Sequence, residues 1–117
     1  MENKSLVFTA TYNESENIKN FLDIALKLHN IDILIVDDNS PDGTAKVVEE
    51  YKKKFDNLNL IVRKGNEGLD TAHKLAFKFA LENDYQNLIT MDADLSHDPS
   101  KIPMFIEELN STSFVIG

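Results

Sequence analysis

Two aspartates separated by one residue are the sharpest chemical feature of the sequence, Asp92 and Asp94 with Ala93 between them. They follow a short apolar run, so both carboxylates can face one hard cation at the end of a buried strand. Oxygen ligands in such a place suit Mg²⁺ or Mn²⁺, which keep several waters and bridge to phosphates. Aspartates can also cap the turn before a helix that begins at Pro99. The residues alone leave both interpretations open.

Polar residues that follow the other apolar runs can likewise have either a ligand-binding role or a structural one. Asp37 and Asp38 suit turn and capping chemistry, or one of them accepts hydrogen bonds from a base or a ribose. Arg63 can pair with a phosphate, or it is an exposed arginine at a strand end. Tyr12 can stack on a base or pack at the rim. Glu14 can be an acid that the helix dipole favours in a first turn.

Short apolar runs alternate with helical periodicity along the chain, which indicates the elements that must position these residues. The expected strands are 5–10, 31–36, 58–62, 87–91 and 113–116. Two of the expected helices are 14–28 and 69–81. A third begins at 44, with residues 47, 48, 51 and 55 inward, and a fourth begins at 99, with residues 102, 105, 106 and 109 inward. This alternation predicts an α/β fold with a parallel sheet and helices on both faces. Ligands of such sheets bind at the carboxyl ends of the strands, where the polar residues lie.

Length, composition and missing motifs exclude several classes of protein. The chain has 117 residues, 42% hydrophobic and 27% charged, which suits one domain over 1–117 with a core of its own. It has no cysteine, so disulfides and thiol nucleophiles are excluded. The formal net charge of -8 argues against nucleic acid as a partner. Glycine-rich dinucleotide motifs, P-loops and GxSxG elbows do not occur. No apolar run reaches the ~20 residues of a membrane span, so a cytoplasmic domain is expected.

Three motifs resemble those of the dolichyl-phosphate mannosyltransferases, which are inverting family-two glycosyltransferases of the GT-A fold. The motifs are TYNESENI at 11–18, IVDDNSPDGT at 35–44 and MDADLSHDP at 91–99, in the family's order and spacing. The resemblance covers essentially the whole chain. It implies a Rossmann-like, three-layer αβα structure with a mostly parallel sheet. The family continues for about a hundred more residues, so the resemblance implies a C-terminally truncated domain, the nucleotide-sugar-binding portion of the enzyme.

The resemblance also implies which residues lie near the nucleoside of the donor. Tyr12 and Glu14 match the positions at the base and the ribose. Val36 and Asp38 match those that hold the guanine or uracil ring. Ala10 stands where the family usually has proline, at the start of the first motif.

Other matched positions lie near the phosphates and the metal. Arg63 matches an arginine that follows the third strand and belongs to the donor-phosphate side. Asp92, Ala93 and Asp94 match the Asp-x-Asp element, with Asp94 as the principal metal ligand and Asp92 at ribose or metal. Ser96 matches a position that supplies another contact in the metal shell. The resemblance assigns no catalytic residue within this chain.

The resemblance implies that the donor is a nucleotide sugar, most of all GDP-mannose, and that it binds with a divalent Mg²⁺ or Mn²⁺. The implied acceptor is a polyprenyl or dolichyl phosphate, which would bring the domain to the periphery of a membrane. A UDP sugar is the alternative donor, because ring contacts include backbone groups. A non-catalytic binding module or half of a split enzyme is the alternative function. In that case the fifth strand leaves an open sheet edge, where a protein partner or a second copy can pair.

Overall fold

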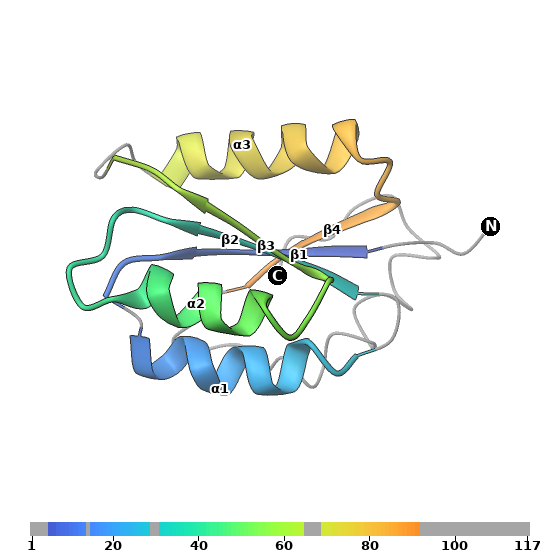
Figure 1. Ribbon diagram of the computed structural model, residues 1–117. Helices are drawn as coiled ribbons and strands as arrows, with labels where there is room; N and C mark the ends of the chain where they lie inside the picture. The colour runs from blue at the N-terminus through green and yellow to red at the C-terminus, as the bar shows by residue number, and fades with distance from the viewer. Residues whose placement is uncertain (1–4, 14, 29–30, 65–68, 92–117) are drawn as a thin grey trace.

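The computed structural model describes residues 5–13, 15–28, 31–64 and 69–91. The elements in these residues are β1 Ser5–Thr11, α1 Ser15–Ala25, β2 Ile31–Asp37, α2 Thr44–Lys52, β3 Leu58–Val62, α3 Leu69–Glu82 and β4 Asn87–Thr90. The sheet order is β3-β2-β1-β4, and every pairing is parallel. Figure 1 shows α1 and α2 on one face of the sheet and α3 on the other. The predicted α/β architecture is therefore confirmed.

Right-handed crossovers account for these layers. The connections from β1 to β2 and from β2 to β3 cross the sheet in one direction, and the connection from β3 to β4 crosses it in the other. Helices of opposite crossing direction lie on opposite faces. Residues of β1 alternate accordingly, with Val7 in the cluster of α1 and α2, and Leu6 and Phe8 in the cluster of α3. The α3 cluster is built on small residues, Ala72, Ala76 and Ala80.

The observed boundaries differ from the predicted ones at element ends. β1 and β2 each run one residue further than predicted, because Thr11 and Asp37 pair in register. The helix predicted over 14–28 ends at Ala25, so that prediction is wrong at its end. Beyond Ala25 the amides of Lys27 and Leu28 donate to carbonyls three residues back, as in a 3₁₀ turn.

The other ends differ less. β4 ends one residue earlier than predicted, and α3 ends one residue later. Phe55 lies beyond the last residue of α2 but still packs against the core, as its inward assignment predicted. The helix predicted from Pro99 and the strand predicted at 113–116 lie outside the described residues. In the part of the chain that the structure describes, no helix has the length and apolar character to cross a bilayer.

Candidate functional site

The candidate site lies at the carboxyl edge of the sheet, where β1 and β2 end side by side. Thr11 and Asp37 are their last residues, and both are buried. Thr11 Oγ1 donates a hydrogen bond to Asp37 Oδ1 at 2.6 Å. The amide of Asp38 donates to the carbonyl of Thr11 at 3.1 Å, which carries the strand pairing one residue further. The two loops that follow therefore begin from a fixed base.

Asp37 holds these loops together with a carboxylate that has no exposed surface. Its Oδ1 accepts hydrogen bonds from Thr11 Oγ1 and from Ser40 Oγ at 2.6 Å, and its Oδ2 accepts from the Ser40 amide at 2.9 Å. Ser40 Oγ in turn accepts a hydrogen bond from the Asn13 amide at 2.9 Å. A buried carboxylate needs such donors to offset the loss of water. Of the two interpretations left open for Asp37, the structure supports the turn-forming one.

Both loops turn sharply at an asparagine in the left-handed region. Asn13, two residues after β1, and Asn39, two residues after β2, each have φ 57. Asparagine tolerates this conformation better than most residues because its short polar side chain can bond locally. Each turn changes the direction of the chain just after its strand, before α1 in one case and before α2 in the other.

Asp42 links the amino-terminal ends of α1 and α2. Its Oδ2 accepts a hydrogen bond from the Ser15 amide at 3.1 Å, and its Oδ1 accepts from the amide and the hydroxyl of Thr44. The Thr44 hydroxyl, more than any other group, holds the pKa of the Asp42 carboxyl below its ordinary value, and the bond from Ser15 adds to this although desolvation opposes it. The positive ends of two helix dipoles favour a carboxylate in this place. Asp42 is therefore a structural link that the sequence analysis did not single out.

Asp42 is expected to make the stability of the fold fall in acid. Because its pKa is lowered in the folded state, the stabilisation is present above the unfolded value and is lost as the pH falls through the folded value. The wild type should therefore lose more of its free energy of unfolding than Asp42→Asn when the pH drops from about 6 to about 3. Urea unfolding of both proteins at several pH values measures this. Parallel curves for the two proteins would contradict the assigned role.

Arg63 and Asp38 form an ion pair between the ends of β3 and β2. Arg63 Nε donates to Asp38 Oδ1 at 2.6 Å, and Arg63 Nη1 donates to Thr71 Oγ1 in the first turn of α3 at 2.7 Å. The side chain of Arg63 is only 7% exposed and that of Asp38 is 21% exposed. The alternative of an exposed arginine at the strand end is therefore wrong. The guanidinium instead fixes the Asp38 carboxylate at the sheet edge, where part of it stays accessible.

The other residues predicted near the nucleoside differ in their accessibility. Tyr12 is 57% exposed, directly after β1. Val36 has no exposed surface and packs in the α3 cluster, beside the half-buried Ala10 with which it pairs in register. A ligand at this edge therefore has no access to the Val36 side chain. Glu14 lies outside the described residues.

The residue that precedes the acidic motif is firmly held. The Met91 amide donates to the carbonyl of Phe8 at 3.0 Å, and Thr9 Oγ1 donates to the carbonyl of Met91. Met91 is buried, and it ends the described chain beside β1 at the carboxyl edge. The predicted metal-site residues Asp92, Ala93, Asp94 and Ser96 lie outside the described residues. Within 5–13, 15–28, 31–64 and 69–91, no group of three or more acidic, histidine or cysteine side chains could hold a metal ion.

Several residues of this edge were not predicted as site residues from the sequence. They are Thr11, Ser40, Asp42 and Thr71. A polar hollow of about 260 Å³ also lies beside the first turn of α1, lined by Asn13, Ser15, Glu16, Asn17 and Asp42. Sequence position gave one available signal, because Thr11, Ser40 and Asp42 lie at or just after the predicted strand ends. Their side chains are ordinary turn and cap formers, so only the structure reveals that they act together.

Comparison with known proteins identifies the family. A model described as glycosyl transferase family 2 matches residues 6–117. An undecaprenyl-phosphate mannosyltransferase of Micrococcus luteus is 34% identical over 96% of this chain and 46% of its own length. A dolichol-phosphate mannosyltransferase of Pyrococcus furiosus is 37% identical over 97% of this chain and 32% of its own length. The chain thus spans less than half the length of these relatives.

A solved structure shows the same fold. The mannosyltransferase PcManGT of Pyrobaculum calidifontis, in complex with GDP-Man and Mn²⁺, matches 93% of this chain and 33% of its own with a TM-score of 0.74 and 22% identity. At 22% identity this match shows the fold alone, and the fold is that of the GT-A glycosyltransferases. The family model matches nearly the whole chain, from residue 6 to residue 117. This chain therefore belongs to glycosyltransferase family 2.

Proposed function

We propose that this chain is the donor-binding part of a glycosyltransferase that transfers mannose from GDP-mannose to a polyprenyl or dolichyl phosphate. The observation that carries the proposal is the partly accessible Asp38 carboxylate, held by Arg63 at the sheet edge of a family-two chain. The names of the relatives from Micrococcus luteus and Pyrococcus furiosus support mannose transfer to a lipid phosphate. The GDP-Man and Mn²⁺ of the structural neighbour support the donor and the metal.

The nucleoside would bind between the loops that follow β1 and β2. Asp38 offers a carboxylate to the N–H groups of a base, and Tyr12 offers an exposed ring on the neighbouring loop. Because Arg63 already fixes the Asp38 side chain, little conformational entropy remains to be lost when a base binds. Val36 would contact the nucleoside through its backbone groups, because its side chain is buried. We assign Ala10 and Glu14 to the same side of the donor.

The metal would be held by Asp92, Asp94 and Ser96, with Ala93 between the carboxylates. Carboxylate and hydroxyl oxygens are ligands that Mg²⁺ and Mn²⁺ prefer. The neighbouring aspartates of the described edge are already engaged, Asp37 by three donors and Asp38 by Arg63. A bound divalent ion would offset the charge of the donor diphosphate, which a chain of formal net charge -8 otherwise repels, and would stabilise that diphosphate as a leaving group.

The acceptor phosphate would attack the anomeric carbon of the sugar directly, with inversion. The chain spans less than half of the mannosyltransferase relatives, so acceptor binding belongs to the proposal for a whole protein of their length. The residues of this chain have the narrower task of binding and orienting the donor. That task can be tested on the chain as it is.

Calorimetric titration tests donor binding and the identity of the base. GDP-mannose and UDP-glucose are titrated separately into the chain with Mn²⁺ present. We expect GDP-mannose to bind more tightly than UDP-glucose. Tighter binding of UDP-glucose would show that the donor is a UDP sugar and not GDP-mannose. The absence of binding to either would contradict the proposal.

Replacing Asp38 with asparagine should weaken nucleotide binding by about tenfold or more, equal to about 1.4 kcal/mol. The amide retains an acceptor for Arg63 but loses the charge that strengthens hydrogen bonds to a base. The loss should also occur without Mn²⁺, because this contact is made to the nucleoside. Asp56→Asn, at an exposed position, makes the same change in net charge and serves as the control. Equal affinities of the two variants would count against a base contact at Asp38.

A further inference from the structure

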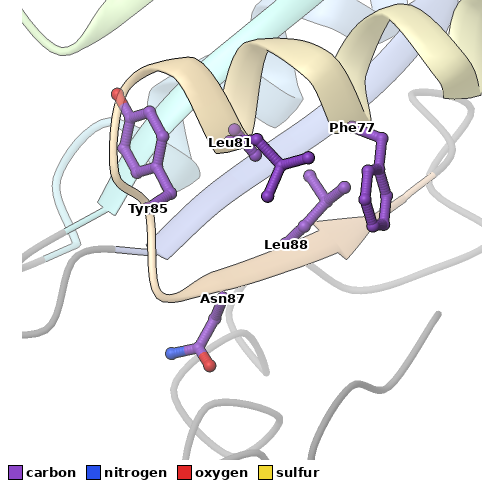
Figure 2. A pocket seen from close by; sticks show the side chains of 6 residues that line it. Phe77, Leu81, Tyr85, Asn87 and Leu88 are labelled. Atoms are coloured by element: carbon purple, nitrogen blue, oxygen red, sulfur yellow. The ribbon is translucent and has the colours of Figure 1, made fainter.

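The described sheet ends in two edge strands, β3 and β4, and each of them pairs with one described neighbour. The β4 edge borders a small apolar hollow of about 20 Å³ beside the carboxyl-terminal half of α3 (Figure 2). This strand leads directly into 92–117, which lie outside the described residues. β3, in contrast, has described chain on both sides of it, within 31–64. The structure therefore shows what the outer edge of β3 offers to a partner.

The backbone groups of β3 point alternately toward β2 and away from it. The Ile33 amide donates to the carbonyl of Asn57 at 2.8 Å, and the Arg63 amide donates to the carbonyl of Asp37 at 2.8 Å. With the register of β3 against β2, these bonds mean that the odd-numbered residues of β3 face β2. The outward N–H and C=O groups belong to Leu58, Leu60 and Val62. No helix or loop of the described chain forms a backbone hydrogen bond with them.

The outer edge of β3 lacks the features that usually protect an edge strand. Proteins blunt such edges with charged side chains, prolines or bulges. The sequence of β3 is LNLIV, without charge or proline, and its register against β2 is continuous. Val62 at its end is 48% exposed, although it is apolar and β-branched. An apolar edge of this kind favours pairing with another strand.

The same strand of a second copy fits this edge in one antiparallel register. When Leu60 stands opposite Leu60 of the second copy, Leu58 stands opposite Val62, and Val62 stands opposite Leu58. All three are residues whose N–H and C=O groups point outward, so each facing pair can exchange two hydrogen bonds. Each facing pair also brings two apolar side chains together across the strands.

The charges beyond the two ends of β3 agree with this register. Asp56 lies two residues before the strand and Lys64 lies two residues after it, and both are exposed. In the antiparallel register, Lys64 of each copy comes next to Asp56 of the other. Opposite charges at the rim of an interface favour association and fix its register. A shift of two residues would instead bring Lys64 next to the exposed Lys54 of the other copy, where like charges repel.

We propose that the outer edge of β3 is an interface between two copies of this chain, which join their sheets through antiparallel β3 strands. One strand pair buries less than the roughly 1,200–2,000 Å² of a stable complex, so the dimer is weak and forms only at high concentration. The carboxyl edges of the two sheets point in opposite directions, which leaves both candidate sites open. The interface rests on the sheet edge alone and is independent of the proposed function.

Exchanging the two charges tests the interface and its register. Sedimentation velocity from micromolar to millimolar concentration gives the dimer dissociation constants of the wild type, Lys64→Asp, Asp56→Lys and the double variant. Each single variant brings like charges together at both ends of the strand pair and should raise the dissociation constant about tenfold. The double variant restores opposite charges between copies and should dimerise like the wild type. Within one copy the two positions lie at opposite ends of β3, beyond the ~8 Å over which surface charges act, so this rescue must arise between copies.

A proline at the outer edge gives a second test. The Val62 N–H points outward, so Val62→Pro removes no hydrogen bond to β2 but prevents pairing with another strand. Val62→Thr keeps the N–H and a similar shape, and it is the matched control. We expect Val62→Pro to stay monomeric at every concentration and Val62→Thr to dimerise.

Three results would overturn the proposal. They are a wild type that is monomeric even at millimolar concentration, a dimer that Val62→Pro leaves intact, and a double charge variant that dimerises no better than the single ones. If Val62→Pro fails to fold, the charge exchange still decides, because both of its positions are exposed.

Discussion

Replacing Arg63 with methionine is expected to lower the free energy of unfolding by about 3 kcal/mol, the lower end of the range for breaking a buried ion pair. The guanidinium is almost fully buried, bonded to Asp38 at 2.6 Å and to Thr71 at 2.7 Å. Methionine fills similar space but leaves the Asp38 carboxylate without its cation. Partial exposure of Asp38 lets water offset some of the loss, which is why the lower end of the range applies.

Urea unfolding measures this effect, with Lys64→Met as the matched control. Lys64 follows Arg63 directly but is exposed, so its replacement should change stability by less than about 0.5 kcal/mol. Arg63→Lys should recover only part of the loss, because one ammonium cannot reproduce a fork that reaches two partners. Equal stabilities of Arg63→Met and Lys64→Met would show that the ion pair does not stabilise the fold.

Asp37→Asn is expected to lower the free energy of unfolding by about 2–3 kcal/mol, the size of a lost hydrogen bond to a charged group. Both oxygens of this buried carboxylate accept hydrogen bonds, two from hydroxyl groups and one from the Ser40 amide. An asparagine has only one acceptor oxygen, so its NH₂ group must face at least one of these donors. The β2–α2 loop, which carries Asp38, loses its anchor as a result.

The matched control is Asp56→Asn, the same chemical change at an exposed position. It should leave the urea midpoint nearly unchanged. If Asp37→Asn unfolds at the same urea concentration as this control, the carboxylate does not hold the loops as the geometry indicates.

Asp37 and Asp38 show how far the sequence could predict the site. The apolar run before them predicts that both lie at a strand end, and the topology of α/β sheets predicts that strand ends form the site. The sequence does not separate their roles, because adjacent aspartates have the same chemistry. In the structure one is fully buried and joins two loops, while the other is partly exposed and pairs with Arg63.

The pairing of Arg63 with Asp38 depends on the register of β3 against β2, which the local pattern around either residue does not reveal. β2 and β3 are neighbours, and Asp37 stands opposite Val62, so the next residues on each strand meet. Strand order and register follow from packing across the sheet, not from the local pattern around either residue. The sequence predicted the elements well but the end of α1 poorly. No glycine or proline marks where that helix ends.

We propose that this chain binds a nucleotide sugar through a divalent ion held by Asp92 and Asp94. The most direct test is calorimetric titration of GDP-mannose into the wild type and into Asp94→Ala, each with Mn²⁺ and with a chelator. We predict that the wild type needs Mn²⁺ to bind and that Asp94→Ala binds at least about tenfold more weakly, a loss of about 1.4 kcal/mol. Asp56→Ala, the exposed control, should bind like the wild type. Equal affinity of Asp94→Ala and the wild type, with no dependence on Mn²⁺, would contradict the claim.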